Sequence, residues 1–148
     1  MGSLQAEPLV VLVDDEQTDR MLAASALREA HFAGEIKELD TGSALLEFLA
    51  GHPERTRPVV VLLDFNLPGM NGIDVLTEIE RRAESASIPV VMITSSHAKS
   101  LRSMAQAHGA LCTITKPDTY PAFVQVFSEL RGSLLQQGLL GPQSATRA

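Results

Sequence analysis

The stretch that decides the fold of this chain is Val59-Val60-Val61-Leu62-Leu63-Asp64-Phe65-Asn66-Leu67-Pro68-Gly69-Met70-Asn71-Gly72. Its unbroken apolar run is typical of a central strand that is buried on both faces of a parallel sheet. The strand ends at Asp64, and Pro68 and Gly69 predict a loop after it. Open α/β sheets bind their ligands at the carboxyl ends of the strands, so Asp64 is the first candidate for a functional residue.

Four other segments also have the length and composition of strands. They cover residues 9–13, 35–39, 89–93 and 111–115, and the charged residues of 35–39 suit a sheet edge. Apolar residues at helical spacing predict helices at about 17–30, 41–50, 72–84 and 98–108, and a last helix that begins at Asp118 or Thr119. Strict alternation of strands and helices predicts a five-stranded parallel sheet that is covered by helices on both faces.

The length and composition indicate one domain. With 148 residues and 45% hydrophobic side chains, the chain can bury a core without disulfides. We expect a flexible lead-in at 1–8, a domain at 9–137 and a loose tail at 138–148. The single cysteine, Cys112, excludes an internal disulfide, and we expect it to be a thiol in the core.

The charge pattern argues against several classes of partner. A net charge of −6 leaves no basic surface for nucleic acid. We expect a cytoplasmic protein, since no secretory leader or membrane-spanning apolar segment is evident. The histidines lie near predicted helix ends without clustering, so we expect no metal site at His31, His52, His97 or His108.

Polar residues follow the predicted strands at one edge of the sheet. Asp14, Asp15 and Asp64 would meet there and repel one another unless a cation screened them, and Mg²⁺ is the simplest candidate. Lys116 and the Thr94 hydroxyl fit an incoming phosphoryl group, with Asp64 as the nucleophile. Asp15 can bind the ion directly while Asp14 acts through a water molecule.

These positions resemble the receiver domain of two-component response regulators over about residues 9–130. The matching features are the acid pair Asp14-Asp15, Asp64 in its loop, Thr94, and Lys116-Pro117. The resemblance implies a flavodoxin-like fold with strand order 2-1-3-4-5 and phosphorylation of Asp64 by a histidine kinase. It also implies that Asp15, Asp64 and the backbone carbonyl of Asn66 ligate Mg²⁺.

In this family, Lys116 would contact the phosphoryl group and Thr94 would move toward it. That movement would alter the face made by the fourth helix, the fifth strand and the fifth helix. Many receivers carry an aromatic residue at the position of Thr113, so this chain departs from the pattern there. Asn66 and Ser96 occupy positions that flank the path of the attacking water and would set the lifetime of the phosphoryl group.

The chain ends soon after the last predicted helix, which is typical of a stand-alone receiver with no DNA-binding domain. The loop after Asp64, the Ile114-Thr115-Lys116-Pro117 ending and the leucine-rich last helix resemble the small regulators paired with bacterial phytochrome kinases. Those relatives tend to be dimers. Leucines at 134, 135, 139 and 140 are consistent with a homodimer surface on the last helix, although a disordered tail is the alternative.

Three alternatives stand beside this interpretation. A Mg²⁺-dependent phosphohydrolase with an aspartyl-phosphate intermediate would need a second acid near the nucleophile and a cap over the substrate, whereas Asn66 holds that place. We therefore expect a switch and not an enzyme. A receiver that only binds would not need every site residue, and Thr94 and Ser95 can also cap the next helix.

Overall fold

The computed structural model describes residues 7–51, 57–82 and 85–140, and shows a flavodoxin-like α/β fold. Five parallel strands lie in the order β2-β1-β3-β4-β5, which confirms the expected fold class and places β2 at an edge. The strands are β1 (Leu9–Val13), β2 (Ile36–Leu39), β3 (Val59–Asp64), β4 (Val90–Thr94) and β5 (Cys112–Thr115). The helices are α1 (Gln17–Glu29), α2 (Gly42–Ala50), α3 (Gly72–Arg81), α4 (Lys99–Ala107) and α5 (Tyr120–Gln136).

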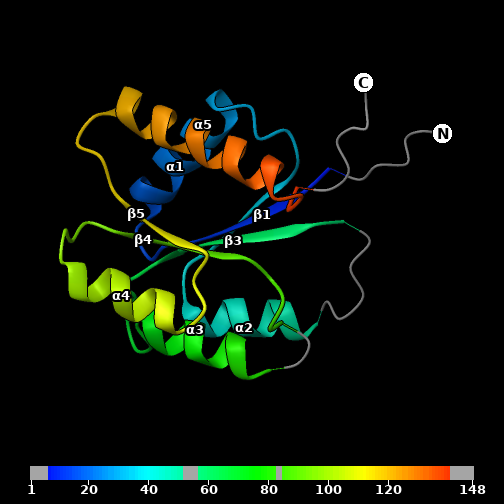
Figure 1. The fold of residues 1–148 in the computed structure, drawn as a ribbon, viewed down its shortest axis with the longest axis vertical. Coiled ribbons are helices and arrows are strands. Elements are labelled where there is room, and N and C mark those ends of the chain that lie inside the picture. Colours follow the sequence, from blue (N-terminus) through cyan, green and yellow to red (C-terminus); the bar gives the residue numbers. More distant parts are fainter. Residues whose placement is uncertain (1–6, 52–56, 83–84, 141–148) are drawn as a thin grey trace.

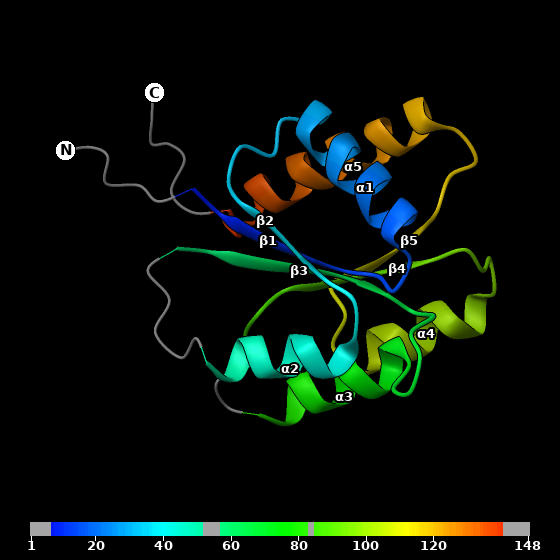
Figure 2. The same ribbon diagram turned by 180° about the vertical axis from the view of Figure 1, so that it is seen from behind.

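The helices cover the sheet on both faces. Helices α1 and α5 lie on one side, and α2, α3 and α4 lie on the other (Figures 1 and 2). Alternate residues of β1, β3 and β4 enter the two apolar clusters, because successive side chains of a strand point to opposite faces. The three central strands are therefore buried from end to end, as their continuous apolar composition predicts.

The strand register brings the polar strand ends together. Val13 lies beside Leu63 in the β1–β3 pair, so Asp14 and Asp64 follow at adjacent positions. In the same way, Thr94 of β4 lies beside Thr115 of β5. One edge of the sheet therefore carries the acids, the hydroxyl and the lysine.

Side-chain caps fix the start of three helices. Thr41 accepts a hydrogen bond from the Ala44 N–H at α2, and Thr119 accepts one from the Ala122 N–H at α5. Asn71 and Asp74 form a reciprocal capping box at α3. Helices α1 and α4 have no side-chain cap, so Thr94 and Ser95 do not cap α4.

The structure corrects two expectations about burial. Cys112 is exposed on β5 and is not a core thiol, because β5 is the last strand of the sheet and pairs with β4 alone among the described strands. Leu134 is fully buried in the protein's own core, and Leu139 and Leu140 pack against that core. Leu134 is therefore not available to a partner, whereas Leu135, Leu139 and Leu140 remain partly exposed.

Element ends differ from the sequence expectations by about one residue, except at α3. The structure ends α3 at Arg81, and the remainder of the expected helix to Glu84 reaches residues 83–84, which lie outside the described residues. The same holds for His52, for most of the expected lead-in and for the tail from 141 onward. Within the described part of the chain, no helix is long and apolar enough to span a membrane.

Candidate phosphoryl-acceptor site

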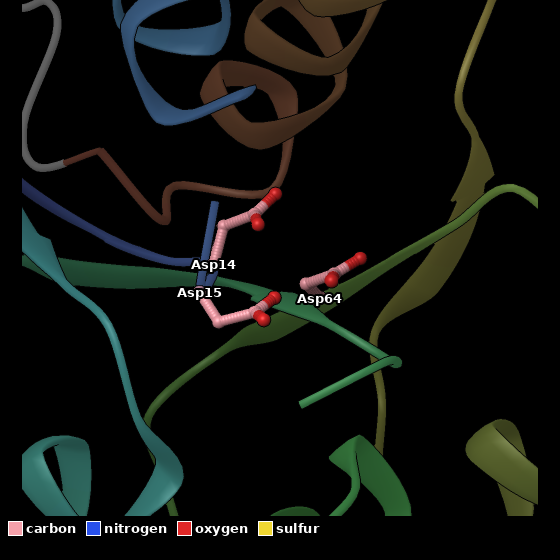
Figure 3. A group of neighbouring side chains, drawn as sticks. All are labelled: Asp14, Asp15 and Asp64. Carbon is pink, nitrogen blue, oxygen red and sulfur yellow. The ribbon is translucent and has the colours of Figure 1, made fainter. Parts of the chain in front are cut away.

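Three carboxylates lie close together at the ends of β1 and β3. Asp14 and Asp15 follow β1, and Asp64 is the last residue of β3; each offers an oxygen within 4.8 Å of the others. Figure 3 shows the three side chains extending to the same side of the strand ends. Asp14 and Asp64 are buried, whereas Asp15 is exposed. No other group of three His, Cys, Asp or Glu in the described residues is placed to share an ion.

Hydrogen bonds fix Asp14 from several directions. Its carboxylate accepts the Glu16 N–H at 2.9 Å, and its own N–H donates to the Leu39 carbonyl at 3.1 Å. The Arg20 guanidinium donates to the Asp14 carbonyl at 2.6 Å and pairs with Glu38 at 3.4 Å. The first turn of α1 thereby holds the acid pair at the end of β1.

Lys116 brings a positive charge to this cluster from the end of β5. The backbone N–H of Lys116 donates to the Thr94 carbonyl at 2.7 Å, which fixes the chain after β5 beside β4. Its ammonium nitrogen lies 3.2 Å from Asp14, 3.2 Å from Asp19 and 3.4 Å from Asp64. One cation therefore faces three carboxylates.

Burial decides the protonation of Asp64. Removal from water raises the pKa of Asp64 to about 6, because the Lys116 ammonium only partly offsets this effect and the Asp14 carboxylate adds to it. Burial alone would lower the pKa of Lys116, but the carboxylates of Asp64 and Asp14 outweigh it and hold that pKa above its ordinary value. Lys116 is therefore charged throughout the physiological range.

The site residues fit a hard divalent cation. Among buried side-chain nitrogen and oxygen atoms of the described residues, only Asp64 Oδ1 has no hydrogen-bond partner. The Lys116 ammonium is within ion-pair distance of this atom but does not hydrogen-bond to it. A buried carboxylate oxygen without a donor, beside two other carboxylates, is suited to the oxygen-only coordination of Mg²⁺. Asp15 and Asp64 would hold the ion.

Thr94 ends β4, the strand next to β3, and Asn66 lies in the loop that follows Asp64. Thr94 is fully buried, and its hydroxyl oxygen accepts the Ser96 N–H at 3.0 Å. Asn66 is exposed in the loop after β3, and its side chain lines a groove with Phe65, Thr94 and Ser96. The structure thus brings every candidate of the sequence analysis to one edge of the sheet.

The position of Thr113 is occupied differently from an aromatic switch. Thr113 is partly buried on β5, and the Arg102 guanidinium of α4 donates to its backbone carbonyl at 2.9 Å. The same guanidinium also donates to the Thr115 hydroxyl. An arginine bridge from α4 to β5 therefore lies beside the residue that precedes Lys116.

Comparison with known proteins decides the family. The model of the response regulator receiver domain matches residues 10–127, which is most of the chain. This chain belongs to the receiver domain family. The receiver is 38% identical over 97 residues to the probable methanogenesis regulatory protein FilR2 of Methanothrix harundinacea, with 63% of each chain aligned. It is 36% identical over 92 residues to response regulator Rcp1 of Synechocystis, covering 60% of this chain and 63% of Rcp1.

These matches therefore span less than two thirds of the two curated relatives. Solved structures align over more of the receiver. The Mn²⁺-bound form of response regulator Rcp1 covers 90% of this chain and 99% of its own, with a TM-score of 0.75 and 26% identity. The bacteriophytochrome response regulator RtBRR covers 85% and 78%, with a TM-score of 0.70 and 30% identity. The receiver thus has a phytochrome-associated regulator and a metal-bound regulator among its relatives.

Sequence analysis missed the role of Asp19. Its pattern assigns Asp19 to the polar side of the first helix, where a charged residue needs no special explanation. In the receiver, Asp19 lies in the first turn of α1 and reaches Lys116, 97 residues further along the chain. Asp19 lies only four residues after Asp15 in the sequence, but the contact with Lys116 follows only from the place of α1 beside the end of β5.

Proposed function

We propose that this receiver accepts a phosphoryl group on Asp64 from a histidine kinase, with Mg²⁺ as cofactor, and signals through the surface of α4, β5 and α5. The observation that carries the proposal is the buried Asp64 carboxylate oxygen, which lacks a hydrogen-bond partner and faces two carboxylates and an ammonium. A purely structural acid cluster would not leave that buried atom without a hydrogen bond. A phosphoryl acceptor needs it free.

The residues divide the chemistry among them. A carboxylate oxygen of Asp64 forms the bond to phosphorus while the phosphorus–nitrogen bond of the kinase's phosphohistidine breaks. Lys116 lies within reach to neutralise the added charge, and the Asp14 contacts hold that ammonium in place. Asp15, Asp64 and the backbone carbonyl of Asn66 would hold Mg²⁺, which when bound would supply further positive charge beside the phosphoryl oxygens.

Thr94 connects the phosphoryl site to the output surface. Its oxygen accepts the Ser96 N–H, so its own proton can be donated to a phosphoryl oxygen. A move of Thr94 toward that oxygen would pull on the turn from Ser96 to Ala98, which is itself held by a 3.1 Å hydrogen bond. Phosphorylation would then favour one position of α4 over another by shifting an existing equilibrium.

The kinase that we propose is of the bacteriophytochrome type. The names of the related structures support this assignment, since RtBRR is a bacteriophytochrome response regulator. We also propose that a second copy of this chain binds the α4-β5-α5 face. The exposed Leu111, which lines a groove with Arg102 and Gln106 of α4 beside β5, supports that surface, whereas Leu134 is buried and does not contribute to it.

We propose a switch that is not an enzyme toward other substrates. Asn66 has no carboxylate to protonate a leaving group, and Ser96 is likewise neither a strong acid nor a strong base. Both line the groove beside Thr94, where they would set the lifetime of the phosphoryl group. Incubation with small phosphomonoesters should therefore give no fast multiple turnover.

Intact mass after incubation with acetyl phosphate and Mg²⁺ tests the proposal. The wild type should gain one phosphoryl group, and both Asp64→Asn and removal of Mg²⁺ by EDTA should abolish the gain. An unmodified wild type, or an Asp64→Asn variant that is modified at the same rate, would contradict the proposal. Sizing with and without a stable phosphoryl mimic tests the second copy.

A further inference from the structure

The ammonium of Lys116 contacts a third carboxylate that the proposed phosphoryl transfer does not use. Three carboxylates surround it at 3.2 to 3.4 Å, and they come from the end of β1, from α1 and from the end of β3. Asp14 and Asp64 belong to the acid cluster at the strand ends, whereas Asp19 does not. Asp19 therefore needs an explanation of its own.

The direction of the hydrogen bonds distinguishes the three acceptors. Lys116 Nζ donates to Asp14 Oδ2 and to Asp19 Oδ2, both at 3.2 Å. Asp64 Oδ1 receives no hydrogen bond, although it lies only 3.4 Å away. Asp19 thus accepts a hydrogen bond that the phosphoryl acceptor lacks.

Among the contacts described for Asp19, the hydrogen bond from Lys116 is the one that links it to the site. The adjacent Arg20 is engaged with the Asp14 carbonyl and with Glu38, so it does not neutralise Asp19. The Asp19 side chain is 38% exposed, against 8% for Asp14 and 7% for Asp64. A contact at the wetter side of the site is the one that Lys116 can leave at the lowest cost, because water can replace its partner.

We propose that Asp19 is a positioning residue that holds the Lys116 ammonium on the α1 side of the site and competes with a phosphoryl group on Asp64. This inference rests on the proposed function and adds a second determinant of phosphoryl affinity. Arrival of the phosphoryl group draws the Lys116 ammonium toward Asp64 and so away from Asp19. The first turn of α1 thereby loses a contact whenever the site is occupied.

Titration with beryllofluoride, a phosphoryl mimic, in saturating Mg²⁺ tests the competition. Asp19→Asn should bind the mimic about 3- to 10-fold more tightly than the wild type, as expected for the release of one partly exposed charge-assisted hydrogen bond. Asp19→Glu retains the carboxylate and should return within about 2-fold of the wild type on the same reasoning. A merely structural role of Asp19 would instead weaken binding in both variants.

Asp118→Asn is the matched control. Asp118 lines the same cavity as Lys116 and Asp19 and carries the same charge as Asp19. The structure gives Asp118 no ion pair with Lys116. If Asp118→Asn tightens binding as much as Asp19→Asn, the effect is one of general charge and the proposal is overturned. Equal or weaker binding in Asp19→Asn also overturns it.

Lysine side-chain NMR gives an independent readout without a phosphoryl mimic. The ¹⁵N signal of the Lys116 ammonium should move in Asp19→Asn and stay in place in Asp118→Asn; an unmoved signal in Asp19→Asn contradicts the proposal. A wild type that binds no beryllofluoride with Mg²⁺ would refute the proposed function, and with it this inference. Failure confined to the Asp19 variants refutes the inference alone.

Discussion

Two neighbouring units of the sheet, β3–α3 and β4–α4, each consist of a buried strand followed by a helix, but their helices are anchored very differently. Helix α3 buries five residues and begins with a capping box, whereas α4 buries only Leu101 and Ala105 and begins at Ala98 without a side-chain cap. The preceding strands also differ, because β3 ends in the buried carboxylate of Asp64 and β4 ends in the neutral hydroxyl of Thr94. Asp64 thus lies next to the helix that buries more residues, and Thr94 lies next to the helix that buries fewer.

The contrast shows how a small site can combine precision with movement. Gly72, the first residue of α3, packs so closely that an added Cβ would lie 2.8 Å from the Phe65 Cα and 2.9 Å from the Met92 sulfur. This close packing keeps the loop after Asp64 in one geometry. Helix α4 is held by two buried residues and by the bridge from Arg102 to β5, so of the two helices its position can respond more readily.

Paired core truncations should give the largest difference between the two units. Leu76→Ala in α3 should lower the free energy of unfolding by about 3–4 kcal/mol, because Leu76 is fully enclosed, and Leu101→Ala in α4 by about 1–2 kcal/mol. Urea denaturation measures both values at constant m-value. Equal losses would show that α4 is anchored as firmly as α3.

The buried charge at the end of β3 should make stability depend on pH. The pKa of Asp64 is about 6 in the fold and 3.8 when unperturbed, so in EDTA the stability of the wild type should fall as pH rises from about 4 to 7. Asp64→Asn should remove this fall and gain about 2–3 kcal/mol at pH 8.

The matched change at the end of β4, Thr94→Val, should leave the pH profile unchanged, since no charge is removed. Addition of Mg²⁺ should stabilise the wild type but not Asp64→Asn, because only the wild type retains the full set of ligands. An Asp64→Asn variant that is less stable than the wild type at pH 8 in EDTA would contradict the electrostatic account.

Helix caps offer a smaller and reciprocal test. Asn71→Ala removes the capping box of α3 and should cost about 1 kcal/mol, while Ala98→Ser adds a cap to α4 and should gain about 0.5–1 kcal/mol. Hydrogen exchange should slow in α4 of Ala98→Ser without a change in α3. An Ala98→Ser variant with unchanged stability would indicate that the N–H groups at the start of α4 already have hydrogen-bond partners.

The smallest effect is expected from the arginine bridge. Arg102→Met keeps the apolar stem but removes the hydrogen bonds to the Thr113 carbonyl and the Thr115 hydroxyl. It should cost about 0.5–1 kcal/mol and speed hydrogen exchange in α4 and β5. Arg81→Met is the control, because Arg81 is an exposed arginine whose ion pair, among the described residues, is with Glu78 of the same helix. Unchanged exchange in α4 would show that the bridge does not restrain it.

The sequence predicted the parts of this molecule that depend on local pattern. Continuous apolar runs place β1, β3 and β4, and strict alternation predicts the parallel sheet covered on both faces, whereas the observed strand order was expected only from the resemblance to receiver domains. Residues that end parallel strands must meet at one edge, so Asp14, Asp64 and Lys116 could be grouped without coordinates. Their burial and distances could not be obtained in this way.

What the sequence did not reveal depends on long-range packing. Asp19 contacts Lys116, which is 97 positions away in the sequence. Cys112 is exposed because β5 is an edge strand, and the apolar composition of β5 does not predict an edge. The Arg102 bridge joins positions 11 and 13 residues apart on two elements, and its geometry follows only from the placement of α4. Each of these features requires the relative position of two elements.

The bridge from Arg102 also bears on how α4 can move. A guanidinium is planar and rigid, and here one such group holds two acceptors on the same strand. A displacement of α4 along β5 therefore has to break both hydrogen bonds, so Arg102 links the position of the helix to the backbone and side chains of the strand that leads to Lys116.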